Sequence, residues 1–422
     1  MFTQLSKKGL SVRQTADRLN KHAYVLSHCT LLMGSWVANI AEVEVKVMLG
    51  NHLHKDASAV HCLRNRIVAL GCEVEKTPEG HRTWHPLLSA LTDATNTLVR
   101  LYGMYNVLKR KLIYELRQHM DQTHEIWDEP TVRILKQIVV DLEEEITWAT
   151  CLSDQMRNLF CPGLPLAGTV AEWQHILDTG AVYSEFRVPA PPVPARDCRF
   201  RFTADLPPLN VKDPDAIPAA LHRMLTSIEI TTIEVCGALI ADSSELPWEF
   251  VLDMARQCWD ESRHAILCYD RIIQLGGRIG QFAINTDLWE VSYDLPIALR
   301  LAAHQRIGEW LGVDGAIAGI ASLRIAGDEI TARSLEYVVA DEIAHVSYGN
   351  KWLRYLTGGD DEKVLQFHFL AMQKRERFGG SINGSPDLPL NREACLRSGF
   401  TLAEVDVLAK IRTERANRAV TV

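Results

Sequence analysis

Two copies of one five-residue pattern place a carboxylate and an imidazole on the same helix face. Residues 260–264 read Asp-Glu-Ser-Arg-His, and residues 341–345 read Asp-Glu-Ile-Ala-His. A glutamate and a histidine three residues apart stand one helical turn above each other, with Cβ atoms about 5–6 Å apart. Such a pair can bind one divalent transition metal. Two pairs on facing helices would supply half of a carboxylate-bridged two-metal site, and single glutamates on two further helices would complete it.

The aspartate that precedes each motif glutamate distinguishes these two copies from a third match. It stands about 100° around the helix from the glutamate. There it can accept a hydrogen bond from the ligating imidazole of the facing helix, which is the usual role of a supporting carboxylate. We therefore predict this role for Asp260 and Asp341. The third match, Glu172 with His175, has no preceding aspartate and lies beside a Pro- and Gly-rich stretch, so we interpret it as chance.

The glutamate on the preceding helix is selected by its depth. A helix that begins near Pro247 places Glu261 14 positions in, and the short connection 241–246 makes the preceding helix antiparallel to it. Glu229 lies 12 positions before residue 241, and Glu234 lies 7 before it. The resulting mismatch in depth is about 3 Å for Glu229 and about 10 Å for Glu234. Glu229 is the first choice, and Glu234 stays as the alternative because a bend in the helix would move it.

Glu309 is the corresponding candidate in the second helical hairpin. The segment around it is almost entirely apolar or basic, and it precedes Glu342 by 33 residues, much as Glu229 precedes Glu261 by 32. A buried glutamate costs several kcal/mol unless it is protonated, paired or bound to a metal. An ion pair with Arg306 is the alternative explanation for Glu309.

The elements that must position these residues are helices. Helical periodicity with few strand signals predicts an all-α protein. We predict four long helices in each half of the chain: 22–49, 54–70, 86–124 and 129–159, then 216–240, 247–275, 296–326 and 328–356. The predicted domains are a helical bundle at 1–160, a Pro- and Gly-rich connection at 161–214, a bundle with the metal at 215–360 and a helical tail at 361–422.

The two halves resemble each other at fixed offsets, which suggests a duplication. Residues 128–135 resemble 328–335 at an offset of 200, and residues 66–71 resemble 271–276 at an offset of 205. In these registers the metal-ligand positions of the second half are not repeated in the first. Glu261 corresponds to Asp56, His264 to Ala59, Glu342 to Leu142 and His345 to Glu145. We therefore predict that the first half is a degenerate, metal-free bundle, the alternative being helix-forming composition shared by chance.

Composition argues against several other classes of protein. The 422-residue chain has a net charge of −8 and a pI of about 6, without a basic stripe for a nucleic-acid backbone. Its ten cysteines show no Cys-x-x-Cys pair, as expected for reduced thiols. The N-terminal residues lack the apolar core of a signal peptide, and the apolar runs are too short to span a bilayer. We expect a cytoplasmic protein without a membrane partner.

Three stretches, 227–236, 340–352 and 389–400, resemble the bacterial DUF455 family and, more broadly, the ferritin-like superfamily. The resemblance covers about residues 205–405, with Cys395 where an arginine is expected and an inserted loop at 379–387. It implies a four-helix bundle in the C-terminal half, preceded here by the degenerate bundle. It also implies two metal ions, usually iron, with manganese as the alternative at either position. The implied ligands are Glu229 (or Glu234), Glu261, His264, Glu309, Glu342 and His345.

The paired motifs resemble those of the oxygen-activating members of this superfamily. The leading hypothesis is a di-iron oxidase or oxygenase that uses O₂ and an electron donor to oxidise a small organic substrate. A ferroxidase or metal-handling protein without an organic substrate is one alternative, and a hydroxylase of a tRNA nucleoside is another. A homodimer is left open. Four aromatic residues beside ligand positions could line a substrate pocket or simply pack in the core: Trp259, Trp310, Tyr337 and Tyr348.

Overall fold

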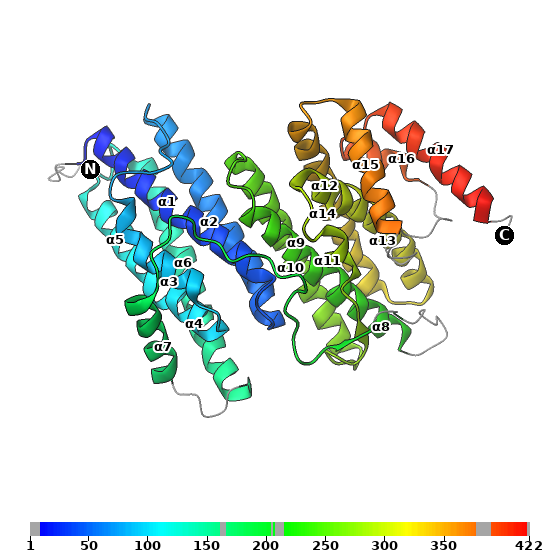
Figure 1. Cartoon of the computed structure of the whole chain (residues 1–422), viewed down its shortest axis with the longest axis horizontal. Coiled ribbons are helices and arrows are strands. Elements are labelled where there is room, and N and C mark those ends of the chain that lie inside the picture. Colours follow the sequence, from blue (N-terminus) through cyan, green and yellow to red (C-terminus); the bar gives the residue numbers. More distant parts are fainter. Residues whose placement is uncertain (1–8, 161–165, 204–205, 207–214, 377–389, 420–422) are drawn as a thin grey trace, which may run out of the picture. The chain divides into compact units, whose positions relative to one another are not determined.

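The computed structural model describes residues 9–160, 166–203, 206, 215–376 and 390–419 (Figure 1). Helices dominate the described residues, so the prediction of an all-α protein is confirmed. Two short strands, β1 (Arg201–Phe202) and β2 (Ala283–Ile284), form a parallel pair. The described cysteines are all free. The inserted loop at 379–387 lies outside the described residues.

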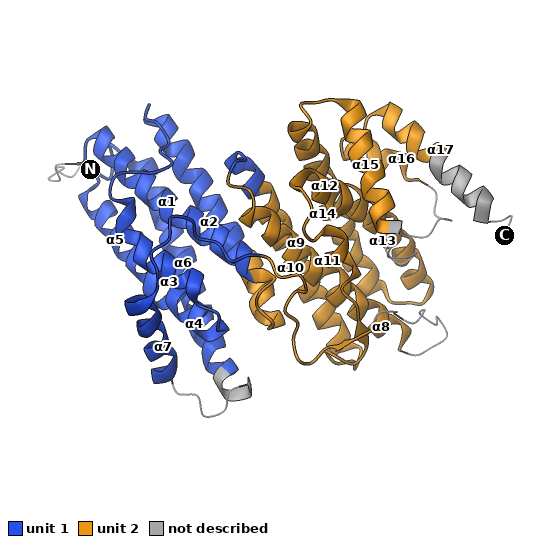
Figure 2. Ribbon diagram, in the orientation of Figure 1, with its two compact units in different colours: residues 1–36, 51–189, 245–252 blue, residues 37–50, 190–244, 253–422 orange. Residues whose placement is uncertain are grey.

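The chain divides into two compact units that interleave along the sequence (Figure 2). Unit 1 comprises residues 1–36, 51–189 and 245–252, and unit 2 comprises residues 37–50, 190–244 and 253–422. Each unit therefore contains a short segment from the opposite half of the chain, whereas the predicted bundles were continuous ranges.

The first half of the chain consists of helices and short helical turns. In chain order these are α1 (Val12–Val37), α2 (Val43–Ala69), η1 (His81–Trp84), α3 (His85–Asp93), α4 (Thr97–Leu101), the π-helical η2 (Tyr102–Lys109), α5 (Arg110–Gln122), α6 (Glu129–Phe160) and α7 (Leu166–Thr179).

The predicted boundary between the first two helices is wrong. It was placed at 50–53, but α1 ends at Val37 and α2 continues through Gly50. A Cβ atom on Gly50 would lie 2.1 Å from Ser262 Oγ and 2.8 Å from the carbonyl oxygen of Cys258. This glycine therefore permits a close contact between α2 and α10 within unit 2, instead of ending a helix.

The predicted irregular connection at 161–214 contains one regular helix, α7. Residues 161–165, 204–205 and 207–214 of this stretch lie outside the described residues. Glu172 and His175 lie on α7 and are both exposed. Their exposure agrees with the interpretation of this third motif as a chance match.

The second half of the chain contains the four predicted long helices, two of which include a π-helical turn. In chain order the helices are α8 (Ala216–Arg223), the π-helical η3 (Met224–Glu229), α9 (Ile230–Ala241), α10 (Trp248–Gln274), α11 (Asp287–Ser292), α12 (Ile297–Leu301), the π-helical η4 (Ala302–Gly308), α13 (Glu309–Ile325), α14 (Glu329–Leu356), α15 (Asp361–Glu376), α16 (Arg392–Arg397) and α17 (Leu402–Ala419).

Local sequence explains several of these helix ends. Pro296 immediately precedes α12, where its fixed φ suits the start of a helix. The Asp328 side chain caps α14 by accepting a hydrogen bond from the Thr331 N–H. Gly276 and Gly327 follow α10 and α13 with φ of 80° and 82°, a conformation that glycine adopts without strain. These ends set the lengths of the helices that carry the site.

The continuous rod α8–η3–α9 is the most apolar helix of the described residues. Residues Ala216–Ala241 are long and apolar enough to cross a membrane by length and composition alone, contrary to the expectation of shorter apolar runs. However, 83% of its most apolar window is buried inside the fold, as in the core helix of a folded domain. This rod lies in the core of unit 2.

The C-terminal helices pack onto α12–η4–α13 and α14. Val364 and Ala371 of α15 lie in a buried cluster with Ile307 and Leu353. A second cluster joins α13 and α14 to the C-terminal helices α16 and α17 through Trp310, Val346, Cys395, Phe400, Val405 and Leu408. Cys395, which departs from the expected arginine, is therefore a buried apolar contact.

Candidate metal centre

Four helical rods of unit 2 bring the six predicted ligand residues together. Glu229 is the last residue of η3, and Glu309 directly follows η4 as the first residue of α13. The two Glu-x-x-His pairs lie on α10 and α14. None of the six residues is more than 5% exposed: Glu229, Glu261, His264, Glu309, Glu342 and His345.

These residues form two overlapping groups, each with four potential ligand atoms within 4.8 Å of one another. One group contains Glu229 and His264 together with two shared glutamates. The other contains Glu309 and His345 together with the same two glutamates. The shared residues are Glu261 and Glu342. The geometry is therefore that of two adjacent cation positions with two carboxylates in common.

Each shared carboxylate directs one oxygen towards each histidine. Glu261 Oε2 lies 3.1 Å from His264 Nδ1, and Glu261 Oε1 lies 3.0 Å from His345 Nδ1. Glu342 repeats the arrangement, with Oε1 at 3.8 Å from His264 Nδ1 and Oε2 at 3.4 Å from His345 Nδ1. A carboxylate that bridges two ions needs this division of its two oxygens.

The far side of each imidazole contacts the aspartate of the opposite motif. His264 Nε2 lies 3.2 Å from Asp341 Oδ2, and His345 Nε2 lies 3.4 Å from Asp260 Oδ2. In each ring, an N–H at Nε2 would donate to the aspartate and leave the Nδ1 lone pair facing the glutamates. This is the relation predicted from the motif spacing, and it is the one that orients a ligating histidine.

Two arginines hold the aspartates in place. Arg263 forms ion pairs with both Asp260 and Asp341, and Arg256 donates to Asp260 at 2.9 Å. Burial would raise the pKa of Asp260, but its hydrogen bonds to His345 and the two arginines outweigh burial and hold that pKa well below its usual range. Asp260 is therefore ionised at neutral pH. Arg263 lies inside the first motif, but no role was predicted for it from the sequence.

The four ligand carboxyls lie together in the interior of unit 2. Their ion-pair partners are histidines only, and none is paired with a lysine or arginine in the described part of the chain. Glu229 Oε2, Glu342 Oε2 and His345 Nδ1 are buried without a hydrogen-bond partner there. Two divalent cations would balance four carboxylates and give these atoms partners, so the residues fit a pair of metal ions.

Burial shifts the pKa values of two ligand carboxyls upwards. It raises the pKa of Glu229 to about 8, against the opposing effect of His264. It also raises the pKa of Glu342 well above the usual value, with the negative charges of Glu309 and Glu261 adding to the effect. Without a cation, these groups would hold protons at neutral pH, whereas a bound cation would displace them.

Glu234, the alternative to Glu229, belongs to a different cluster. It is fully buried and forms ion pairs with Lys46 and Arg196, and it is in neither group of potential ligands. Two basic side chains already compensate its charge. Glu229, the first choice from the sequence, lies in one of the two groups instead.

Glu309 is not paired with Arg306, the alternative partner considered for it. Arg306 instead binds Glu404 of α17 at 2.7 Å. Glu309 accepts a hydrogen bond from the side-chain amide of Gln257 at 2.9 Å and lies 3.3 Å from His304 Nε2. Neither neighbour was predicted from the sequence, although Gln257 lies one turn before Glu261 and its spacing is a usable signal.

The comparison with protein families covers this same region. The family described as "Protein of unknown function (DUF455)" matches residues 167–406, more than half of the chain. The chain belongs to the DUF455 family. The match includes all six ligand candidates and extends further towards the N-terminus than the predicted start near residue 205.

One curated relative is an uncharacterized protein of Haemophilus influenzae. It is 28% identical over 166 residues, which are 38% of this chain and 55% of that protein. The chain thus spans about half the length of the curated relative it matches. No solved structure matches the chain.

The four aromatic residues considered for a pocket lie in different environments of this DUF455 protein. Tyr348 is half-buried, with its ring 6.3 Å from that of His345, and Trp259 is half-buried beside Asp260. Trp310 is buried in the cluster with the C-terminal tail. Tyr337 is 75% exposed, which does not suit the wall of an enclosed pocket.

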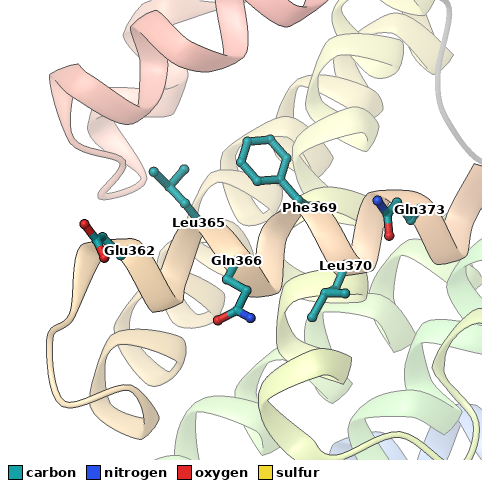
Figure 3. A pocket seen from close by; sticks show the side chains of 6 residues that line it. All are labelled: Glu362, Leu365, Gln366, Phe369, Leu370 and Gln373. Atoms are coloured by element: carbon teal, nitrogen blue, oxygen red, sulfur yellow. The ribbon is translucent and has the colours of Figure 1, made fainter.

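A surface hollow on α15 is separate from the candidate centre (Figure 3). Its lining is Glu362, Leu365, Gln366, Phe369, Leu370 and Gln373. Figure 3 shows that all six side chains come from this one helix. None of them belongs to the groups of potential metal ligands.

Proposed function

We propose that this DUF455 protein is an O₂-dependent, non-haem di-iron oxidoreductase with a ferritin-like bundle in unit 2. The observation that carries the proposal is the pair of shared carboxylates, each with one oxygen towards each histidine. The proposed ligands are Glu229, Glu261, His264, Glu309, Glu342 and His345.

The donor set favours iron or manganese over metals that prefer sulfur. It consists of four carboxylates and two imidazoles, and no cysteine belongs to either group. Carboxylate and imidazole ligands suit iron and manganese, whereas thiolates favour zinc or copper(I). Two iron ions held by these residues would couple the reduction of O₂, with electrons from an external donor, to the oxidation of a substrate.

The protein's own residues would hold and orient this centre and exclude water from it. Asp260 and Asp341 fix the histidine rings, and Arg263 fixes both aspartates. Near-complete burial of the ligands keeps bulk water away from them. Tyr348, half-buried beside His345, is the candidate for contact with an organic substrate.

A small organic substrate is favoured over a metal-storage role by the architecture around the site. A storage subunit needs only one compact bundle, but this chain adds unit 1 and the helices α15–α17, which pack on the bundle. The net charge of −8 does not favour a tRNA substrate.

The test is metal loading under anaerobic conditions followed by exposure to O₂. We expect about two iron ions per chain and O₂ consumption that His345→Ala abolishes. His175→Ala is the matched control, because His175 belongs to the exposed Glu-x-x-His on α7 and should leave both quantities unchanged. One zinc ion per chain, or no iron after anaerobic loading, would contradict the proposal. Uptake of many iron ions per chain would instead indicate storage.

A further inference from the structure

The two units contain the same side-chain clamp at matching positions. In unit 1, Arg66 Nε donates to Thr131 Oγ1 at 3.0 Å, and in unit 2, Arg271 Nε donates to Thr331 Oγ1 at 3.0 Å. Each arginine also forms an ion pair with the aspartate three residues before that threonine. The arginines are 205 positions apart (271 − 66) and the threonines 200 (331 − 131), the two offsets of the sequence repeat.

The helices repeat at the same offsets. Elements α4, η2 and α6 begin at residues 97, 102 and 129, and α12, η4 and α14 begin at 297, 302 and 329. Helices α2 and α10 are each followed by a left-handed glycine, Gly71 with φ 72° and Gly276 with φ 80°. Shared helix-forming composition alone would not reproduce a π-helical turn and a tertiary clamp in register. These repeated features support the predicted duplication of one helical design.

These registers place a lysine where unit 2 has a ligand glutamate. Lys109 is fully buried and forms ion pairs with Asp56, at 2.9 Å, and with Glu145. Subtracting the offsets relates these residues to three candidate ligands of unit 2: Asp56 to Glu261 (261 − 205), Lys109 to Glu309 (309 − 200) and Glu145 to His345 (345 − 200).

We propose that the ammonium group of Lys109 takes, in unit 1, the place of the cation that Glu261, Glu309 and His345 would bind in unit 2. Unit 1 is then a copy of the bundle that carries its own cation and needs no metal. The comparison with unit 2 rests on the proposed function, but the ion pairs of Lys109 do not.

The charges within unit 1 agree with this substitution. Burial opposes the charged form of Lys109, but Asp56 and Glu145 outweigh it and hold the pKa of the ammonium well above its usual value. Burial raises the pKa of Glu145 to about 8, with Lys109 acting in the opposite direction. Burial likewise raises the pKa of Asp56, and Lys109 again acts in the opposite direction, so the ammonium favours the charged form of both carboxyls.

Two ligands of the second cation position, Glu342 and His264, have apolar counterparts in unit 1. Leu142 is buried at the register of Glu342, and Ala59 stands at the register of His264. Neither side chain can bind or repel a cation. The acidic counterparts that remain, Asp56 and Glu145, are the two residues that pair with the ammonium of Lys109.

The first test removes the ammonium from the full chain in the presence of EDTA. Lys109→Met should lower the melting temperature of the affected transition by about 5–15 °C, because it leaves buried carboxyls without a cation. Adding Asp56→Asn and Glu145→Gln should recover most of the loss. Lys55→Met is the control, because Lys55 is partly exposed and pairs with the exposed Glu144. An unchanged melting temperature for Lys109→Met would overturn the proposal.

The second test converts the site into a metal site. Lys109→Glu supplies a third carboxylate and should bind about one more Mn²⁺ per chain than the wild type in equilibrium dialysis. If this variant does not fold in EDTA, recovery on refolding only with Mn²⁺ supports the proposal. No additional Mn²⁺, or no recovery with Mn²⁺, would overturn it. If Lys109→Glu binds Mn²⁺ and the wild type binds none, the result contradicts the proposed function but not the proposed role of Lys109.

Discussion

Substitution of a glutamate shared by both ligand groups should weaken metal binding more broadly than substitution of a glutamate that belongs to one group. Glu342 lies in both groups, whereas Glu229 and Glu309 lie in one each. Glu342→Gln should therefore weaken both metal positions. Glu229→Gln and Glu309→Gln should each weaken one position and leave the other with its full set of four ligands.

The loss of metal affinity can be estimated from the free energy that each ligand contributes. Metal sites with four protein ligands bind with about 10–16 kcal/mol, so each ligand contributes on the order of 3 kcal/mol. Losing one carboxylate should then weaken a position by about 100-fold. Glutamine keeps the size of the side chain and removes its charge, which limits the structural disturbance.

Equilibrium dialysis with Fe²⁺ under anaerobic conditions, followed by elemental analysis, separates the two cases. At an Fe²⁺ concentration about ten times the wild-type dissociation constant, Glu229→Gln and Glu309→Gln should each retain about one iron per chain. Glu342→Gln should retain almost none. The reasoning would be refuted if Glu342→Gln kept one iron with wild-type affinity, since its carboxylate would then serve one position only.

Three further predictions follow from other contacts. Asp260→Asn or Asp341→Asn should weaken iron binding by about 10–100-fold without abolishing it, and an Fe²⁺ isotherm that matches the wild type would contradict their role. Gly50→Ala should lower the unfolding free energy by about 1–3 kcal/mol in urea titrations, because its new Cβ meets both backbone and side chain of α10; wild-type stability would show that α2 can shift freely. Burial lowers the pKa of His222 from 6.5 to about 4, and its Nε2 accepts a hydrogen bond from the Gly280 N–H. Since the folded pKa lies below the unfolded one, the unfolding free energy should fall as the pH drops from about 6.5 to about 4. His222→Gln should flatten this decline in urea titrations across that range, and an unchanged slope would contradict the assignment.

Periodic helices and motif spacing predicted much of unit 2, because helix geometry converts sequence separation directly into depth. The two motifs located His264 and His345 relative to the glutamates, and counting residues favoured Glu229 over Glu234. The π-helical turns η3 and η4 were not predicted, because a single extra residue in a turn leaves no mark in the apolar pattern. The side-chain partners of Glu234 also escaped prediction, since Lys46 is 188 positions away.

Gly50 shows why the first half was harder to divide into helices. A glycine inside an otherwise helical stretch commonly marks a helix end, but here it is required by a neighbour more than 200 positions away. Only the contact with α10 shows that this glycine lies inside a helix and does not end one.

The interleaving of the two units limits how this protein can be cut into fragments. A fragment that begins after residue 160 keeps all six candidate ligands but lacks residues 37–50, which belong to unit 2. It would lose Lys46, one of the two cations that neutralise buried Glu234, and with it the part of α2 that packs on α10 at Gly50. A fragment that ends at residue 160 would similarly lack residues 245–252 of unit 1. Expression of either half as a continuous piece is therefore expected to give an incomplete core, and the two halves should complement each other better when produced together.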